Sequence, residues 1–134
     1  RYPILAASGS AGPKRREGDG QVPEGFYPIE WLNPNSRYHL SLRIGYPNAT
    51  DRARAEAEGR SDEPLGGDIM IHGGAASIGC LAMGDPAAED LFVLAARAGM
   101  ERGAIWLLSW HPDTRPPAAD PLSQDLAEAV RNLR

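Results

Sequence analysis

The sequence predicts a β-rich domain of mixed α/β class, and three observations favour it. Residues 1–48 show no helical period and contain short apolar runs separated by Gly and Pro, which is typical of strands and turns. Residues 38–44 alternate between apolar and polar side chains, as a half-buried strand does. After residue 85, two stretches with a helical period bracket one further apolar run.

In the first half, a long loop rich in Gly and Pro over residues 9–25 precedes two strands. Loops of this length in compact domains are usually either functional or disordered. Residues 26–32 have the composition of a strand, but Pro28 has no amide hydrogen, so we expect an edge strand or a strand start there. The clearest strand covers residues 38–44, and its apolar face consists of Tyr38, Leu40, Leu42 and Ile44.

The middle of the chain predicts a short helix and a short strand. Residues 50–58 form a helical stretch with Thr50 as its N-cap and Gly59 as its stop signal. Because this stretch has no apolar stripe beyond Ala, we expect a solvated surface insertion. Residues 68–72 then alternate as a short buried strand that ends on His72.

The remaining elements are two helices and a strand. Asp85 and Pro86 form a cap-and-proline start for a helix whose apolar face contains Leu91, Leu94, Ala95 and Ala98. Residues 104–110 predict a strand. Asp120 and Pro121 repeat the helix start, and Leu122, Leu126, Val130 and Leu133 mark a final amphipathic helix.

Length and chain start bear on the domain organisation. The 134 residues are 42% hydrophobic, which suffices for one packed core, so we expect a single domain over residues 1–134. The chain begins at Arg1, without a methionine or a signal-peptide pattern. We therefore expect a domain that is incomplete at its N-terminus and lacks its first strand or strands.

Composition also excludes several functional classes. No apolar run approaches the ~18 residues of a membrane-spanning helix. A single Cys excludes an internal disulfide and metal sites built from several thiolates. The net charge of −4 argues against a nucleic-acid-binding protein. The basic cluster Lys14–Arg16 fits a solvated loop better than a phosphate-binding patch, and the cellular compartment stays open on composition alone.

The chemistry concentrates in residues 68–85, which hold Cys80, His72 and several glycines. A thiol becomes an effective nucleophile when a base or a positive field converts it to the thiolate. If His72 ends a strand, the Gly-rich link can fold back and bring its imidazole to Cys80, as an acyl-transferring thiol enzyme requires. Two simpler interpretations stay open, a small buried Cys and a structural His. A metal site is disfavoured, since one Cys and one His leave two ligands unaccounted for.

These residues resemble the active-site signature of the YkuD-type L,D-transpeptidases, cysteine enzymes of bacterial peptidoglycan. The resemblance rests on His72-Gly73 and on Ser77-Ile78-Gly79-Cys80, and ordered motifs between residues 8 and 48 extend it to most of residues 1–95. Ile78 replaces the second His of the usual pattern, Ala82 replaces its Arg or Asn, and the spacer is short. With these departures, the motif resembles that of one branch of the family, in which the spacer is short. Members of this branch include the enzyme that detaches the major outer-membrane lipoprotein from murein.

The resemblance implies a fold, a reaction and a set of site residues. The fold would be a β-sandwich-like domain with peripheral helices. Cys80 would be the acyl-accepting nucleophile and His72 its base, Gly79 and Cys80 would supply oxyanion-binding amides, and Ser77 would orient the His through its backbone carbonyl. No cofactor and no metal would be needed. Arg37, His39 and Arg43 lie on the polar side of their strand and could bind carboxylates of the stem peptide, although a solvent-facing position fits Arg43 better. Gly73 is a further candidate for substrate binding.

The implied substrate is an amide centred on meso-diaminopimelate in a peptidoglycan stem peptide, which would leave a thioester on Cys80. Attack by an amine gives a transferase, and attack by water gives an amidase that releases, for example, a murein-linked lipoprotein. The implied location is the periplasm or cell envelope, and carbapenem-type inhibitors are expected ligands. A catalytically silent wall-binding domain and a cytosolic thiol hydrolase stay open as alternatives.

Overall fold

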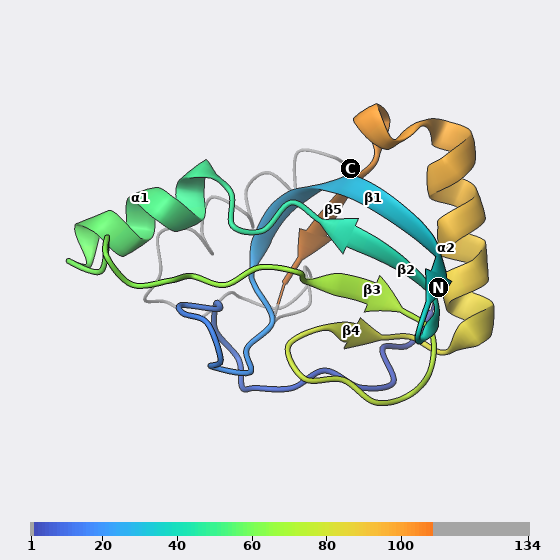
Figure 1. The fold of residues 1–134 in the computed structure, drawn as a ribbon, viewed down its shortest axis with the longest axis horizontal. Helices are drawn as coiled ribbons and strands as arrows, with labels where there is room; N and C mark the ends of the chain where they lie inside the picture. The colour runs from blue at the N-terminus through green and yellow to red at the C-terminus, as the bar shows by residue number, and fades with distance from the viewer. Residues whose placement is uncertain (1, 109–134) are drawn as a thin grey trace.

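Five strands form one mixed sheet in the order β4-β3-β2-β1-β5 in a computed structural model that describes residues 2–108 (Figure 1). The strands are β1 (Gly25–Ser36), β2 (His39–Ile44), β3 (Met70–His72), β4 (Leu81–Ala82) and β5 (Ala104–Leu107). All neighbours pair antiparallel except β3 and β4, which are parallel. The predicted β-rich mixed α/β class is therefore confirmed. The final helix and the end of the strand expected over 104–110 lie outside the described residues.

The long strand β1 occupies the interior of the sheet and joins its two halves. Its first part, Gly25 to Pro28, pairs with β5, and the part from Ile29 onward pairs with β2. The prediction of an edge strand or a strand start at Pro28 was wrong, because Pro28 lies within β1 and β1 is an interior strand. The proline is tolerated because it stands where β1 changes partners, and its carbonyl still accepts a hydrogen bond from Gly45.

Helix α1 (Ala49–Ala57) lies at one end of the sheet, far from helix α2 (Asp85–Ala98) (Figure 1). The N-cap of α1 is Asn48 and not Thr50, because the Asn48 side chain and the Asp51 carboxylate form a reciprocal capping box. Asp51 is buried, and its carboxylate accepts a hydrogen bond from the Tyr27 hydroxyl at 3.0 Å. Burial raises the pKa of Asp51, against opposing hydrogen bonds from the Asn48 amide and Tyr27. Helix α1 is therefore anchored to the core and is not a fully solvated insertion.

Helix α2 packs against the sheet mainly through small residues. Gly84 is its N-cap, and Asp85 is the first helical residue, so the expected Asp85 cap is displaced by one position. Ala88 and Ala95 are buried, and Leu91 and Phe92 pack against the core. The predicted apolar face was shifted, since Leu94 is 65% exposed. None of the helices within residues 2–108 is both long and apolar enough to cross a membrane.

The hydrophobic core lies between the sheet and α2, and alternate residues of the central strands fill it. Leu42 and Ile44 of β2 are buried, as the alternation predicts. Tyr38 precedes β2 and is half exposed, so it does not belong to this apolar face. The other core residues are Tyr27, Ile29, Tyr46, Ile69, Ile71, Leu81, Ala95 and Leu107.

The loop over residues 9–25 is held together by an ion pair between Lys14 and Asp19. Lys14 Nζ lies 2.7 Å from Asp19 Oδ1, and both side chains are largely buried. The same carboxylate accepts hydrogen bonds from the amides of Arg15, Arg16 and Gln21. Burial on its own would raise the pKa of Asp19, but Lys14 and the three amides outweigh it and lower the pKa to about 2.

We expect protonation of Asp19 to loosen this loop. Because its folded pKa lies below the unfolded value of ~3.9, the ionised carboxylate stabilises the loop above that value. This stability is lost as the pH falls towards 2. Relative to intrinsic rates, amide hydrogen exchange at Arg15, Arg16 and Gln21 should accelerate between about pH 5 and about pH 2.

Asp19→Asn should produce the same fast exchange already at about pH 5. Asp62→Asn is a matched control, because Asp62 is an exposed acid in a turn outside this loop. Amide protection in Asp19→Asn equal to that of the parent protein would contradict the assignment.

Candidate functional site

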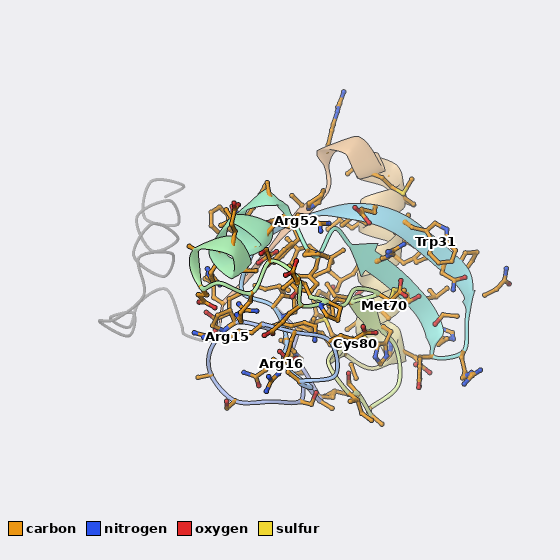
Figure 2. All side chains as sticks on the ribbon, turned by 60° about the vertical axis from the view of Figure 1, so that its left-hand side comes forward. Arg15, Arg16, Trp31, Arg52, Met70 and Cys80 are labelled. Carbon is orange, nitrogen blue, oxygen red and sulfur yellow. The ribbon has the colours of Figure 1, made fainter. Side chains whose placement is uncertain are left out.

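An open pocket of about 270 Å³ lies at the β3–β4 side of the sheet, on the face opposite the core. Its walls come from the β1–β2 hairpin, from β3 and from the link between β3 and β4. The lining residues are Ser36, Tyr38, Ser41, Met70, His72, Ala76, Ser77, Ile78 and Cys80. Figure 2 shows Met70 and Cys80 close to one another on this side of the molecule. The structure thus brings His72, Ser77 and Cys80 to one cavity.

His72 is the last residue of β3 and is only 3% exposed. Its Nδ1 lies 2.6 Å from the backbone oxygen of Gly73, and the Tyr38 ring lies 4.7 Å from the imidazole, centroid to centroid. Since a carbonyl oxygen only accepts hydrogen bonds, Nδ1 carries the hydrogen in this contact. In the neutral tautomer Nε2 is then left with its lone pair, as a general base requires.

Cys80 immediately precedes β4 and is partly exposed. Its backbone amide donates to the Ser77 hydroxyl at 3.0 Å, and its thiol donates to the backbone oxygen of Asp68 at 3.7 Å. We expected Ser77 to orient His72 through its carbonyl. In the structure the carbonyl that meets the imidazole belongs to Gly73, and the Ser77 hydroxyl supports the turn that carries Cys80.

The turn before Cys80 is also fastened to the N-terminal segment. Gly79 has a φ of +83°, which favours glycine, and its amide donates to the Ser8 hydroxyl. Ser8 in turn donates to the backbone oxygen of Gly20 in the 9–25 loop. Both amides expected to bind an oxyanion, those of Gly79 and Cys80, therefore have a serine hydroxyl as their present acceptor. Ser8 carries no sequence signal for this role, because the contact joins residues far apart in the chain.

Gly73 packs too closely for any side chain. A Cβ there would lie 2.4 Å from Asp85 Oδ1 and 2.7 Å from the backbone oxygen of Tyr38. The Asp85 carboxylate also accepts a hydrogen bond from the Gly74 amide at 2.8 Å, so the start of α2 holds the loop after His72. Gly73 thereby contributes the carbonyl that orients His72 and the space that the loop needs.

Arg37 and His39 lie in or beside the β1–β2 hairpin but not in the pocket lining. His39 Nε2 is 2.7 Å from a Glu89 carboxylate oxygen of α2, and Arg37 is exposed. A role for either in substrate binding stays a prediction.

Sequence reasoning missed Met70 and Ser41 as pocket residues, although the period of two already places them on the same side of their strands as His72. Within residues 2–108, no group of three or more His, Cys, Asp and Glu side chains is arranged to hold a metal ion.

Residues 1–103 match the family described as the L,D-transpeptidase catalytic domain, YkuD. The chain belongs to the YkuD family of L,D-transpeptidase catalytic domains. It is 44% identical over 93 residues to "Putative L,D-transpeptidase YafK" of Escherichia coli K12, and equally to the protein of that name from strain O157:H7. These matches cover 68% of this chain and 35% of the relatives' length. The chain therefore spans about a third of the relatives it matches.

Solved structures share the L,D-transpeptidase fold at low identity. The helical cell shape determining protein Pgp2 from Campylobacter jejuni, as its K307A mutant, superposes with a TM-score of 0.55 at 23% identity. That match covers 93% of this chain and 43% of Pgp2. Bd1075 of Bdellovibrio bacteriovorus gives a TM-score of 0.50 at 20% identity, covering 92% of this chain and 46% of Bd1075. At these identities the likeness supports the fold alone.

We expect Gly73→Ala to disrupt the L,D-transpeptidase site and the fold around it. The added methyl group would collide with the Asp85 carboxylate and the Tyr38 backbone, so the free energy of unfolding should fall by about 2 kcal/mol or more. Urea denaturation measures this change. Gly67→Ala is the matched control, because its added Cβ meets nothing closer than 3.9 Å and should change stability by less than ~0.5 kcal/mol. Equal stability of the two variants would contradict the close packing at Gly73.

Proposed function

We propose that this domain is a cysteine acyl transferase that acts on peptidoglycan stem peptides through a thioester on Cys80. One observation carries the proposal. A buried His72, oriented by Gly73 so that Nε2 is left as a base, lines the same open pocket as the only Cys in the chain. Membership of the L,D-transpeptidase family supports the substrate class, amides centred on meso-diaminopimelate.

The first half of the reaction follows from the roles of these two side chains. His72 Nε2 takes the proton of the Cys80 thiol, and the sulfur attacks the carbonyl carbon of the substrate amide. The carbonyl π electrons move to oxygen, and the oxyanion replaces the Ser77 or Ser8 hydroxyl as the acceptor of a backbone amide. When the oxyanion collapses, the C–N bond breaks and His72 returns the proton to the leaving amine. The acyl group remains on sulfur as a thioester.

The second half decides between transfer and hydrolysis. An amine that attacks the thioester forms a new amide and regenerates the thiol, whereas water releases a carboxylate. The pocket is open, and Ile78 at its rim is 89% exposed, so the thioester would be reachable by water as well as by a peptide amine. This exposure keeps an amidase, for example one that releases a murein-linked lipoprotein, as the second candidate. For either reaction we propose the periplasm or cell envelope as the site of action.

We expect a carbapenem to acylate Cys80. Incubation should add one drug mass to the intact protein, since the β-lactam carbonyl offers the thiol an activated amide. Cys80→Ala should show no adduct, and His72→Ala should react more slowly by about 10²-fold or more because the general base is lost. Intact mass spectrometry over time measures both effects.

The reaction of Cys80 with a small alkylating agent in guanidinium chloride is the control for the His72 variant. Unfolded parent and His72→Ala should then react at the same rate, because the effect of the imidazole depends on the fold. The absence of an adduct in the folded parent would contradict the enzyme proposal and favour a catalytically silent domain.

Purified sacculi separate the two reactions. A transferase should produce new cross-links or amine-exchanged stem peptides, and an amidase should release free stem ends or protein. We expect transfer products from the parent protein and none from Cys80→Ala. Release without any transfer product would replace the transferase proposal with the amidase.

A further inference from the structure

Arg43 of β2 lies beside the pocket, on the same face of the sheet. Its register partners are Trp31 of β1 and Met70 of β3, and Met70 lines the pocket with Cys80. Because paired residues of antiparallel strands project to the same side, Arg43 stands between the side chains of Trp31 and Met70. In Figure 2 Trp31, Met70 and Cys80 follow one another across this side of the molecule.

The guanidinium of Arg43 makes few close polar contacts with the described residues of the protein. Among the described residues, its Nε is buried without a hydrogen-bond partner. The nearest carboxylates are Asp68, 3.3 Å from Nη2, and Glu30, 3.9 Å from Nε. Arginine binds a carboxylate best through two parallel N–H groups, and neither neighbour makes such a contact. A buried and unpaired guanidinium N–H is costly, so this group has unused capacity for an anion.

Asp68 connects Arg43 to the nucleophile. Its carboxylate faces Arg43, while its backbone oxygen accepts from the Cys80 thiol. Asp68 also has a φ of +53°, in the left-handed region, which Asp and Asn adopt more readily than most other side chains. The carboxylate is 80% exposed, so only a weak, solvent-screened ion pair holds it at the guanidinium.

We propose that Arg43 is the carboxylate-binding group of the active site and that Asp68 occupies it while no substrate is bound. The ligand class is a peptide with a free carboxylate next to the amide that Cys80 attacks. This subsite rests on the proposed function, since it positions a substrate for Cys80. Trp31 and Met70 flank Arg43 as its register partners on the two neighbouring strands.

The net charge of −4 would not by itself attract such a ligand. Recognition of a carboxylate therefore requires a local cation, and Arg43 supplies one next to Met70, which lines the same pocket as Cys80. The fork of the guanidinium would also fix the orientation of the ligand, which a single point charge does not.

Two alkylating agents that differ in charge test this subsite on Cys80 itself. Iodoacetate carries a carboxylate, and iodoacetamide is its neutral counterpart, so the ratio of their rate constants reports a cation near the thiol. Arg43→Gln should lower the iodoacetate-to-iodoacetamide ratio by about threefold or more. Asp68→Asn should raise it by a similar factor, because it removes the competing carboxylate and Asn tolerates a positive φ.

Arg52→Gln is the matched control, since it removes one positive charge from the exposed surface of α1 and should leave the ratio unchanged. The opposite directions expected for Arg43→Gln and Asp68→Asn guard against a variant that is merely misfolded, which would move both rate constants together. The subsite would be overturned if Arg43→Gln had the same iodoacetate-to-iodoacetamide ratio as the parent protein. It would also be overturned if Arg43→Gln changed this ratio no more than Arg52→Gln does.

The alkylation ratio does not depend on turnover of peptidoglycan. An unchanged ratio together with intact carbapenem acylation would remove the subsite and leave the proposed function standing. The expected changes in the ratio without any carbapenem adduct would remove the proposed function and retain an anion-binding arginine beside Cys80.

Discussion

The parallel pairing of β3 with β4 is the constraint on which the site depends. It places His72 opposite Ala82 and therefore brings the imidazole to the strand that begins directly after Cys80. Parallel neighbours normally need a crossover of about a dozen residues or more, often a helix. Here the connection consists only of residues 73–80, and it can close because Gly74 and Gly79 adopt positive φ values. The short link leaves His72 and Cys80 in one pocket.

Such a short link needs support from outside, and the chain supplies it from three directions. Asp85 at the start of α2 holds the Gly74 amide, and the Ala6–Ala82 bridge ties the N-terminal segment to β4. Ser8 connects the Gly79 amide to the 9–25 loop, whose own order depends on the Lys14–Asp19 pair. The glycine-rich loop therefore supports the turn that carries Cys80, through the Ser8 hydroxyl that bonds both to Gly20 and to Gly79.

Local patterns were enough to predict the strands that build the pocket. The alternation in β2 placed Leu42 and Ile44 on the core face, although it wrongly included Tyr38, and the short run ending on His72 predicted β3. The motif around Cys80 indicated the family. The cap at Asn48 was missed because Thr50 is also a good capping residue, and only the reciprocal bond with Asp51 distinguishes them. The interior place of β1 could not be predicted, because a proline signals a missing donor but not where a strand changes partners.

Residues that function across strands were hidden for a different reason. Arg43, Asp68 and Ser8 meet the site through register, backbone conformation and a contact between distant segments, none of which a one-dimensional pattern contains. The sequence alone favours a solvent-facing position for Arg43 over a carboxylate-binding one. Its position between Trp31 and Met70 appears only when the pairing of three strands is known.

The departures from the family signature are consistent with one another in this arrangement. Position 82, where the usual signature has Arg or Asn, is a fully buried alanine that pairs with His72 in the β3–β4 ladder, so this position supplies no polar side chain to the site. A guanidinium is nevertheless present, because Arg43 projects from β2 on the pocket side of the same sheet. The second histidine of the usual signature is replaced by the exposed Ile78. Among the described residues, His72 is therefore the histidine that lines the pocket. Within this geometry the proposed base, His72, and the proposed carboxylate-binding group, Arg43, lie on adjacent strands that the Ser41–His72 and Arg43–Met70 pairs hold in register.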